Sequence, residues 1–259
     1  MKIYNVFITG ATSGIGLGIA QILASEGHQI AYNGFADIEE TIAISRKLTD
    51  LGAASVHYFD ADMRDGDAIR KMIATAENTM GPMDVLVNNA GIQHVAPIEK
   101  FPIPNWEEVI SVNLTAHFHT IASVIEGMRS RGFGRIINIS SVHGLVASAN
   151  KSAYVSAKHG VVGLTKTIAL ECATDGITVN AICPGWVQTP LVESQINVRS
   201  KMSGRSFEEE ACVLIQERQP SQTFVTPEQI GNLCLYLMNE AAASVTGMAI
   251  PIDGAWTAQ

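Results

Sequence analysis

The sequence predicts an α/β protein in which helices cover both faces of a single doubly wound parallel sheet. Three observations predict this class. Short apolar runs rich in β-branched residues alternate with longer amphipathic runs, the first apolar run ends in a glycine-rich turn, and neither an internal repeat nor a low-complexity linker interrupts the chain. Strands that alternate with helices favour parallel pairing in one sheet. We therefore expect a single domain over residues 1–259.

The predicted strands are short apolar stretches, as expected for strands that are buried on both faces of a parallel sheet. The first strand leads into the glycine-rich turn, and each later strand follows an amphipathic stretch. The full set covers residues 3–8, 29–33, 55–59, 84–87, 135–139, 177–182 and 248–252.

The predicted helices lie between these strands and begin or end at recognisable signals. Gly27, Gly52 and Gly81 follow the first three helices, where glycine accepts the backbone conformation that ends a helix. Thr226 and Pro227 suit the N-cap and the first turn of the last one. The predicted helices cover residues 17–26, 38–51, 64–80, 104–131, 152–172 and 206–218, with a last helix from 226.

Residues 190–219 interrupt the alternation of strands and helices. The segment is charged and helical, and it follows the Pro184-Gly185 turn at the carboxyl end of a strand. Long insertions at this position often cover a bound ligand. We therefore predict a helical substrate lid here, with an ordinary surface excursion as the alternative.

The composition indicates a globular protein with a large buried core. Of the 259 residues, 47% are hydrophobic and 16% are charged, and the formal net charge is -8. This acidic balance argues against nucleic acid or an anionic membrane as a partner. No motif pairs the cysteines at zinc-site or disulfide spacing, so we expect reduced thiols and no metal site at Cys172, Cys183, Cys212 and Cys234.

The start of the chain reads directly as a strand and lacks the shape of a secretory signal. No apolar run approaches the roughly 20 residues of a membrane-spanning helix. We therefore expect a cytoplasmic protein without a membrane partner.

The turn after the first strand carries Gly10, Gly14 and Gly16 and leads into a helix. Glycines in this context let the backbone approach a pyrophosphate, while the start of the helix offers free N–H groups. The spacing differs from the commoner G-x-G-x-x-G pattern, and a tight turn without a ligand is the alternative. Because of the strand–turn–helix context, we predict dinucleotide binding in a Rossmann-type fold.

Tyr154 and Lys158 lie four residues apart in a predicted helix and so share one face of it. A free tyrosine has a pKa of about 10, and a nearby cation would lower that pKa. The pair could then pass a proton to or from a substrate oxygen. Taken alone, the same spacing also fits an ordinary helix with an exposed tyrosine and a lysine that reaches solvent.

Five motifs, taken together and in order, resemble the short-chain dehydrogenase/reductase family, and the resemblance covers the whole chain. They are Thr9-Gly10-x-x-x-Gly14-x-Gly16, Asn88-Asn89-Ala90-Gly91, Ser141, Tyr154-x-x-x-Lys158 and Pro184-Gly185.

This resemblance implies a role for each residue of a catalytic group. Tyr154 would be the acid/base, and Ser141 would hydrogen-bond the reacting oxygen. Lys158 would lower the tyrosine pKa and hold the ribose, and Asn113 would hold a water that links Lys158 to solvent. The alternatives are a surface asparagine and a serine that only caps a strand end.

The resemblance also implies the residues that contact the dinucleotide. Among them, Thr189 would meet the nicotinamide amide. The implied set is Gly10, Thr12, Ser13, Gly14, Ile15, Gly16, Phe35, Asp62, Asn89, Ala90, Gly91, Tyr154, Lys158, Pro184, Gly185, Val187 and Thr189.

Residues 33–40 favour NAD over NADP as the cofactor. This stretch follows the second strand and contains Asp37, Glu39 and Glu40 but no lysine or arginine. A 2′-phosphate needs a cation near this point, so NADP would meet repulsion without a partner. Whether Asp37 reaches the ribose is left open by the sequence.

Four stretches give a closer resemblance to the branch of the family that interconverts D-3-hydroxybutyrate and acetoacetate with NAD: Gly91-Ile92-Gln93-His94, residues 141–148, Asn150-Lys151-Ser152-Ala153-Tyr154, and Pro184-Gly185-Trp186-Val187. This resemblance implies a homotetramer. It also implies that the carboxylate of the substrate is held by Gln93, His143, Lys151 and Gln195, with Trp186 on the apolar side.

Each of these five residues has an ordinary alternative role: His143 could be a structural histidine, Lys151 a solvated charge and Trp186 part of the core. Two other functions stay open at this point. One is another reductase of the family, such as a 3-oxoacyl carrier-protein reductase, and the other is a dinucleotide-sensing protein without catalysis. Ala255 stands where the family usually has a second glycine, so strand pairing near the C-terminus could shift slightly.

Overall fold

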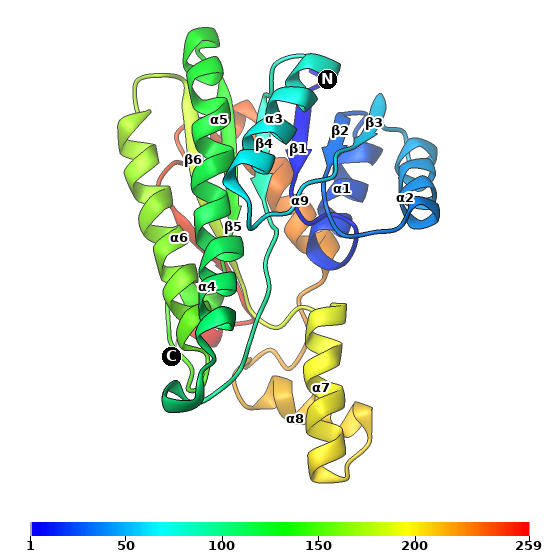
Figure 1. The fold of residues 1–259 in the computed structure, drawn as a ribbon, viewed down its shortest axis with the longest axis vertical. Helices are drawn as coiled ribbons and strands as arrows, with labels where there is room; N and C mark the ends of the chain where they lie inside the picture. The colour runs from blue at the N-terminus through cyan, green and yellow to red at the C-terminus, as the bar shows by residue number, and fades with distance from the viewer. Residues whose placement is uncertain (1, 259) are drawn as a thin grey trace.

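The structure is a computed structural model that describes residues 2–258 (Figure 1). Its strands form one seven-stranded sheet in the order β3-β2-β1-β4-β5-β6-β7, and every neighbouring pair is parallel. This confirms the predicted doubly wound sheet. The strands are β1 (Asn5–Ile8), β2 (Gln29–Tyr32), β3 (Ser55–Tyr58), β4 (Val85–Asn88), β5 (Gly134–Ile139), β6 (Ile177–Pro184) and β7 (Ala249–Ile252).

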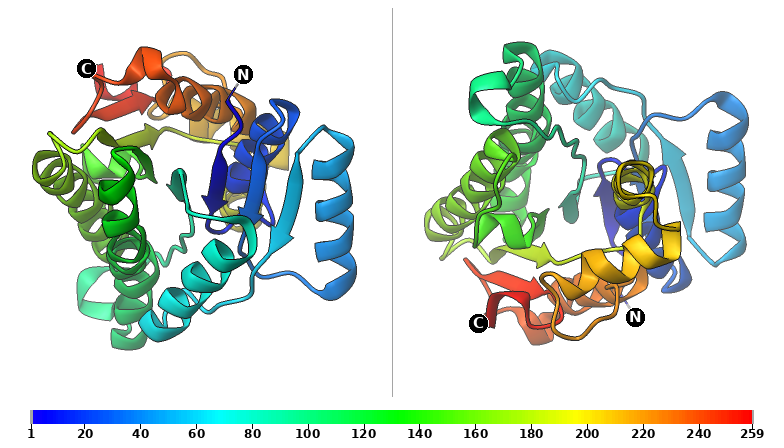
Figure 2. Two further views of the ribbon diagram at one scale, coloured as in Figure 1. Left: turned by 90° about the horizontal axis from the view of Figure 1, so that it is seen from above. Right: turned by 90° about the horizontal axis from the view of Figure 1, so that it is seen from below.

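Helices cover both faces of the sheet, as Figure 2 shows from two ends of the molecule. On one face α1 packs against α9, and on the other α3 packs against α5. The α-helices are α1 (Gly14–Ser25), α2 (Ile38–Asp50), α3 (Gly66–Met80), α4 (Ile103–Ile110), α5 (Ala116–Arg131), α6 (Ser152–Glu171), α7 (Pro190–Ser203), α8 (Phe207–Gln216) and α9 (Pro227–Met238). No helix within residues 2–258 is long and apolar enough to cross a membrane.

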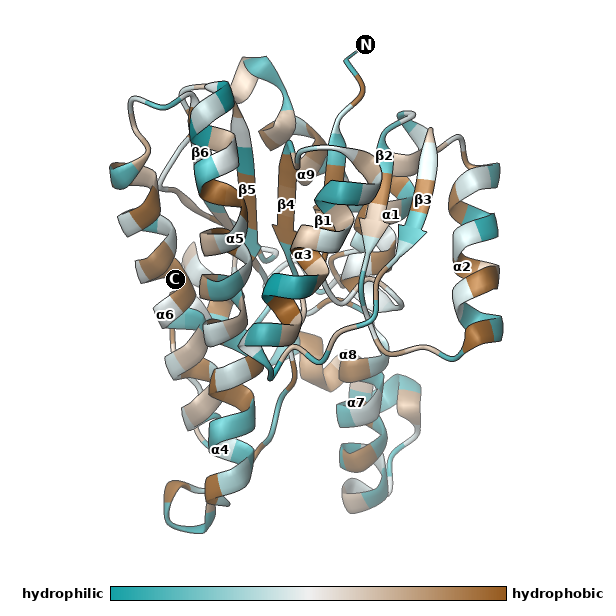
Figure 3. Ribbon diagram, turned by 45° about the horizontal axis from the view of Figure 1, so that its top comes forward, coloured by the Kyte–Doolittle hydropathy of each residue, from teal (hydrophilic) through white to brown (hydrophobic). Residues whose placement is uncertain are grey.

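Two hydrophobic cores lie on opposite faces of the sheet, and β1 contributes to both. Val6 and Ile8 belong to the core beneath α1 and α9, whereas Phe7 belongs to the core beneath α3 and α5. Successive side chains of a strand point to opposite faces. A strand buried on both sides must therefore be apolar throughout, which explains the unbroken hydrophobic runs in the sequence and the apolar centre in Figure 3.

The predicted helix over residues 104–131 is interrupted by a π-helical turn at Ser111–Thr115, between α4 and α5. A single π turn inserts one residue into a helix and often marks a functional position. A second difference is the start of α3, which lies at Gly66 rather than at residue 64. Asp65 caps this helix by accepting hydrogen bonds from the N–H groups of Asp67 and Ala68.

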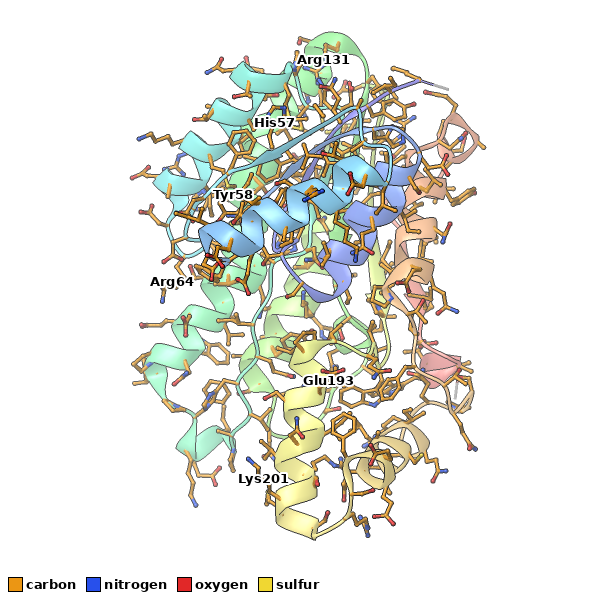
Figure 4. The ribbon with its side chains drawn as sticks, turned by 90° about the vertical axis from the view of Figure 1, so that its right-hand side faces the viewer. His57, Tyr58, Arg64, Arg131, Glu193 and Lys201 are labelled. Atoms are coloured by element: carbon orange, nitrogen blue, oxygen red, sulfur yellow. The ribbon has the colours of Figure 1, made fainter. Side chains whose placement is uncertain are left out.

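The segment after β6 folds into α7 and α8, which project beyond the carboxyl ends of the strands. Glu193 and Lys201 mark the two ends of α7 in Figure 4. Thr189 caps α7 through its hydroxyl, with Pro190 in the first turn. The predicted helical segment is therefore present, and it stands next to the edge of the sheet where ligands of such folds bind.

The turn after β7 contains Ala255, which stands where the family usually has a second glycine. β7 pairs with β6 up to the pair Pro184 and Ile252. Just beyond, Ala255 adopts a left-handed conformation with φ 72. The carboxylate of Asp253 holds this turn by accepting from the N–H groups of Ala255 and Thr257 at 3.0 and 2.9 Å. β7 thus stays paired with β6 to its last residue, and Ala255 beyond it adopts a backbone conformation that favours glycine.

Candidate active site

A cavity of about 580 Å³ opens where the sheet order reverses, at the carboxyl ends of β1 and β4. Dinucleotides bind in this crevice of doubly wound folds. Most of the predicted cofactor residues line this cavity: Gly10, Thr12, Ser13, Gly14, Ile15, Phe35, Asp62, Asn89, Ala90, Gly91, Tyr154, Lys158 and Thr189.

The glycine-rich turn is shaped by close backbone contacts. Gly10 has φ +62, and a Cβ there would lie 2.7 Å from the Cα of Ala90. Gly16 does not line the cavity, and a Cβ at this position would collide with Nδ2 of the Asn89 side chain. That side chain in turn donates to the carbonyls of Thr9 and Gly10 at 2.9 and 2.8 Å. The glycine-rich turn and the turn that contains Asn89 therefore hold each other in place.

The remaining predicted cofactor residues lie in a different place. Pro184, Gly185 and Val187 line a second, smaller cavity, which Tyr154 also lines, rather than the large one. They lie at the end of β6 and in the turn that precedes α7. This turn therefore borders the cavity that Ser141 and Tyr154 line.

The crevice also contains a cation that sequence reasoning missed. Arg64, which is labelled in Figure 4, lines the crevice. Its guanidinium is paired with Asp62 and, at 3.0 Å, with Glu108 of α4. These hydrogen bonds lower the pKa of the Asp62 carboxyl. Asp37 is occupied as well, since its side chain caps α2 by accepting from the N–H of Glu40. The side chains of Arg64 and Asp37 are therefore both bonded to other groups of the protein.

Tyr154, Ser141 and Lys158 come together at the inner end of the crevice. The Lys158 ammonium donates to the carbonyl of Ile139 at 2.8 Å and lies 5.6 Å from the ring centroid of Tyr154. Burial lowers the pKa of Lys158 to about 8. Burial also raises the pKa of Tyr154, and a hydrogen bond from Ser141 only partly opposes this.

The direction of the Tyr154 shift corrects a prediction. From the sequence, the cation of Lys158 was expected to lower the tyrosine pKa. In the folded chain the side chain of Tyr154 is half-buried between the two cavities, and loss of hydration penalises the phenolate more than its surroundings favour it. The phenol is therefore protonated at neutral pH in this state.

Asn113 lies in the π turn and is fully buried. Its carboxamide forms two hydrogen bonds with the main chain of Ile92, accepting from the N–H at 2.9 Å and donating to the carbonyl at 2.7 Å. The side chain thus ties the turn after β4 to the α4–α5 helix. The role of Asn113 in holding a water stays a prediction.

The five predicted substrate-binding residues line one cavity of about 80 Å³, together with Ser141 and Tyr154. They come from four separate parts of the chain, which meet at the carboxyl ends of β4, β5 and β6 and at α7. The set is Gln93, His143, Lys151, Trp186 and Gln195. Sequence reasoning missed the apolar residues Leu191, Val192 and Trp256 of the same cavity.

His143 is buried and bonded on both sides of its ring. Nδ1 lies 3.4 Å from the Ser141 hydroxyl, and Nε2 lies 2.8 Å from the Ser148 hydroxyl. The ring also packs against Tyr154 and Trp256, with centroid distances of 5.9 and 5.6 Å. Burial, followed by the charge of Lys151, lowers the pKa of His143 to about 3. The imidazole is therefore neutral at physiological pH.

Lys151 presents a cation to the cavity. Its ammonium lies 5.0 Å from the ring centroid of Trp186, and burial lowers its pKa to about 8. Among the residues that the structure describes, no carboxylate forms an ion pair with it. Gln195 faces the same space from α7 and donates weakly to the Leu191 carbonyl at 3.4 Å. An anion with a small apolar part would suit this set of groups.

The family follows from comparison with known proteins. A family profile described as short chain dehydrogenase matches residues 4–199. The chain belongs to the short-chain dehydrogenase family. No cluster of three or more His, Cys, Asp or Glu side chains within residues 2–258 is arranged to hold a metal ion, so the described part of this short-chain dehydrogenase offers no such metal site.

Two bacterial relatives match the short-chain dehydrogenase over nearly its whole length. A D-beta-hydroxybutyrate dehydrogenase from Cupriavidus necator is 50% identical over 98% of each chain. One from Rhizobium meliloti is 48% identical over 97% of this chain and 98% of its own. Among solved structures, an actinorhodin polyketide ketoreductase variant with NADPH is similar, with a TM-score of 0.92 and 36% identity, covering 98% of this chain and 97% of its own.

Proposed function

We propose that this short-chain dehydrogenase interconverts D-3-hydroxybutyrate and acetoacetate with NAD. The observation that carries the proposal is the position of Lys151. It brings a cation without an acidic partner among the described residues into the cavity that holds Ser141 and Tyr154. A cavity of about 80 Å³ suits a small substrate. The two hydroxybutyrate dehydrogenases that match the full chain support the same substrate.

The proposed roles follow from the placement of the side chains. Lys151, Gln93 and Gln195 hold the carboxylate, and charge-assisted hydrogen bonds give this end most of its affinity. Trp186, Trp256 and Leu191 enclose the apolar part of the substrate. His143 is given a different role from the one predicted, because its ring nitrogens already contact Ser141 and Ser148. It orients the Ser141 hydroxyl toward the reacting oxygen.

Tyr154 transfers the proton. In the direction of reduction its protonated phenol donates to the carbonyl oxygen of acetoacetate, and in the direction of oxidation it accepts the proton of the hydroxyl group. Ser141 hydrogen-bonds the same oxygen, while Lys158 holds the ribose and Asn113 a water that leads to solvent. The nicotinamide supplies or accepts the hydride when the dinucleotide is bound.

NAD rather than NADP is proposed as the cofactor. The stretch 33–40 contains three acidic residues and no cation. The one arginine that lines the crevice, Arg64, is paired with Asp62 and Glu108. A 2′-phosphate would find repulsion in place of a partner. We expect kcat/KM to favour NAD by at least about tenfold, or roughly 1.4 kcal/mol. Comparable kcat/KM values for NAD and NADP would contradict this proposal.

We also propose that the chain acts as one NAD-binding domain with residues 190–219 as its lid, and that it forms a homotetramer in the cytoplasm. Large apolar side chains on two long helices support an oligomer, since Phe118 of α5 is 55% exposed and Leu170 of α6 is 80% exposed. Light scattering coupled to size exclusion measures the assembly. A monomer at micromolar concentration would contradict the tetramer.

The reaction itself is tested by following NADH formation with D-3-hydroxybutyrate. We expect turnover with the D enantiomer and with acetoacetate in the reverse direction. The alternative, another reductase of the family such as a 3-oxoacyl carrier-protein reductase, predicts a preference for neutral or carrier-linked ketones with NADPH. A kcat/KM for a neutral ketone that exceeds that for acetoacetate would overturn the proposed substrate.

A further inference from the structure

The lid carries a buried carboxylate, Glu210 of α8, which the proposed reaction does not use. Its side chain is 2% exposed. A buried carboxylate is tolerated where cations and hydrogen-bond donors surround it. Arg199 of α7 donates through Nε at 3.1 Å to one oxygen, and Arg205, between the helices, donates through Nη1 at 2.9 Å to the other. Glu210 therefore joins α7, α8 and their connection.

Arg199 has a second carboxylate partner at the end of α8. Its Nη1 donates to Glu217 just after α8 at 3.1 Å, and Nη2 contacts the other oxygen of that carboxylate. The Glu217 side chain is 45% exposed. This pair is bidentate but far more exposed than Glu210, so water and salt screen it and we expect it to contribute less to the position of α7. Glu217 is thus a matched control for Glu210, with the same cation and the opposite burial.

The contacts of Glu210 with Arg199 and Arg205, called the clamp below, bear on the orientation of α7 toward the substrate cavity. Val192 and Ile196 of α7 are buried against Leu214 of α8. Their neighbours in the chain, Leu191 and Gln195, line the substrate cavity. Side chains keep a fixed angular spacing around a helix. Fixing the buried face of α7 on α8 therefore fixes the direction in which Gln195 points.

The other end of the helix pair is tied to the cavity wall. Gln219, which follows α8, is buried, and its Oε1 accepts from the N–H of Trp186 at 2.9 Å. Its Nε2 donates to the carbonyl of Thr223. Thus α8 is anchored beside Trp186, and α7 is held on α8. Helix α8 therefore connects α7, which carries Gln195, with the turn that carries Trp186.

We propose that Glu210 is a positioning residue for the substrate, which acts by clamping α7 to α8 so that Gln195 faces the cavity. The identity of the substrate rests on the proposed function, whereas the clamp rests on the contacts of Glu210 alone. The carboxylate of Glu210 does not touch substrate or cofactor.

The kinetic test compares Glu210→Gln with Glu217→Gln. For Glu210→Gln we expect the KM for D-3-hydroxybutyrate to rise about tenfold, because two arginines lose their buried anion. The dissociation constant for NADH, from fluorescence titration, should stay within about twofold. For Glu217→Gln both quantities should stay within about twofold. An unchanged KM in Glu210→Gln, or equal losses for substrate and NADH, would overturn the positioning role.

Hydrogen exchange tests the clamp without any turnover. In Glu210→Gln, exchange over residues 190–203 should become at least about tenfold faster, while exchange over α9 stays as in the wild type. Unchanged exchange in α7, or faster exchange in both helices, contradicts the clamp. If Glu210→Gln does not fold, Arg205→Gln removes one of the two cations of Glu210 and leaves the Arg199–Glu217 pair in place, and exchange over residues 190–203 should again become faster. A wild type that fails to oxidise D-3-hydroxybutyrate removes the proposed function and leaves this measurement intact.

Discussion

The Nδ1 atom of His143 lies 3.4 Å from the Oγ of Ser141, and the main-chain N–H of His143 donates to the same oxygen at 3.1 Å. The second ring nitrogen lies 2.8 Å from the hydroxyl of Ser148. A neutral imidazole carries one donor and one acceptor nitrogen, so two hydroxyl groups satisfy it completely. We propose that His143 orients the Ser141 hydroxyl next to Tyr154.

Because the imidazole of His143 stays neutral, we expect it not to titrate in the pH profile of kcat/KM. Burial lowers the pKa of His143 to about 3, so the ring stays neutral between pH 5 and about 8. We expect the pH profile of kcat/KM to keep its shape in His143→Gln, while its amplitude falls through the loss of Ser141 orientation. An inflection near pH 6.5 that disappears in this variant would show that the imidazole titrates during the reaction.

The lowered pKa of His143 also makes the free energy of unfolding depend on pH. Unfolded His143 has a pKa of about 6.5, above the folded value of about 3. Between these values the unfolded chain binds a proton that the folded chain does not bind, so the unfolding free energy rises with pH. This contribution is complete above about pH 6.5 and is lost as the pH falls toward 3. Urea unfolding of wild type and His143→Gln should therefore show a difference that shrinks between pH 7 and pH 5.

Tyr154→Phe removes the transferable proton and keeps the shape of the ring. General acid–base catalysis contributes typically about 10²–10⁴-fold, and we expect kcat to fall by that order. NADH binding, measured by fluorescence titration, should be largely kept. Tyr236→Phe is a matched control, because Tyr236 lies on the surface of α9 and is 47% exposed. Near-wild-type turnover in Tyr154→Phe would remove the assignment of this residue.

Much of the fold could be predicted because its signals are local. Thr226 caps α9 through a capping box with Gln229, with Pro227 in the first turn, as the sequence indicated. The π turn at Ser111–Thr115 could not be predicted in this way, since one inserted residue barely changes the apolar periodicity of a long helix. Asn113 was predicted from the family resemblance alone.

The sequence predicted which residues form the candidate site. It did not predict how deeply these residues are buried or how burial shifts their pKa values. The pKa values of His143 and Tyr154 depend on burial, and burial depends on residues that are distant in the chain. Trp256 covers His143 from the end of the chain, with ring centroids 5.6 Å apart. The only available signal for Trp256 was its position just beyond the carboxyl end of the last strand, at the edge where the other site residues meet.

Ala255→Gly should stabilise the protein. Ala255 has φ 72, which costs a non-glycine residue about 1–2 kcal/mol. Glycine adds chain freedom to the unfolded state at a cost of about 0.4–1 kcal/mol. We expect the unfolding free energy to rise by about 0.5–1 kcal/mol in urea titrations. In the control Ala243→Gly, where φ is -59, it should fall by about 0.4–1 kcal/mol. A loss of stability in both variants would mean that Ala255 is not strained.

Lys151→Ala tests the carboxylate site. A C4 hydroxy acid offers few atoms to grip, so its anion must provide most of the recognition. A charge-assisted hydrogen bond contributes about 1.5–3 kcal/mol. Truncation should therefore lower kcat/KM for D-3-hydroxybutyrate by roughly 10- to 150-fold. The methyl ester has the same shape without the charge, and its kcat/KM should change much less. Equal losses on acid and ester would mean that Lys151 supports the fold or the Tyr154 helix instead.

The pH dependence gives an independent readout for the same lysine. Burial lowers the pKa of Lys151 to about 8, so the free enzyme loses this cation as the pH rises through that value. Because kcat/KM reports the free enzyme, the ratio of kcat/KM for the acid to that for the ester should fall above about pH 8. In Lys151→Arg the side chain stays charged at these pH values, and the ratio should remain flat. A ratio that falls identically in wild type and Lys151→Arg would assign the titration to another group, with Lys158 as the first candidate because its pKa is also about 8.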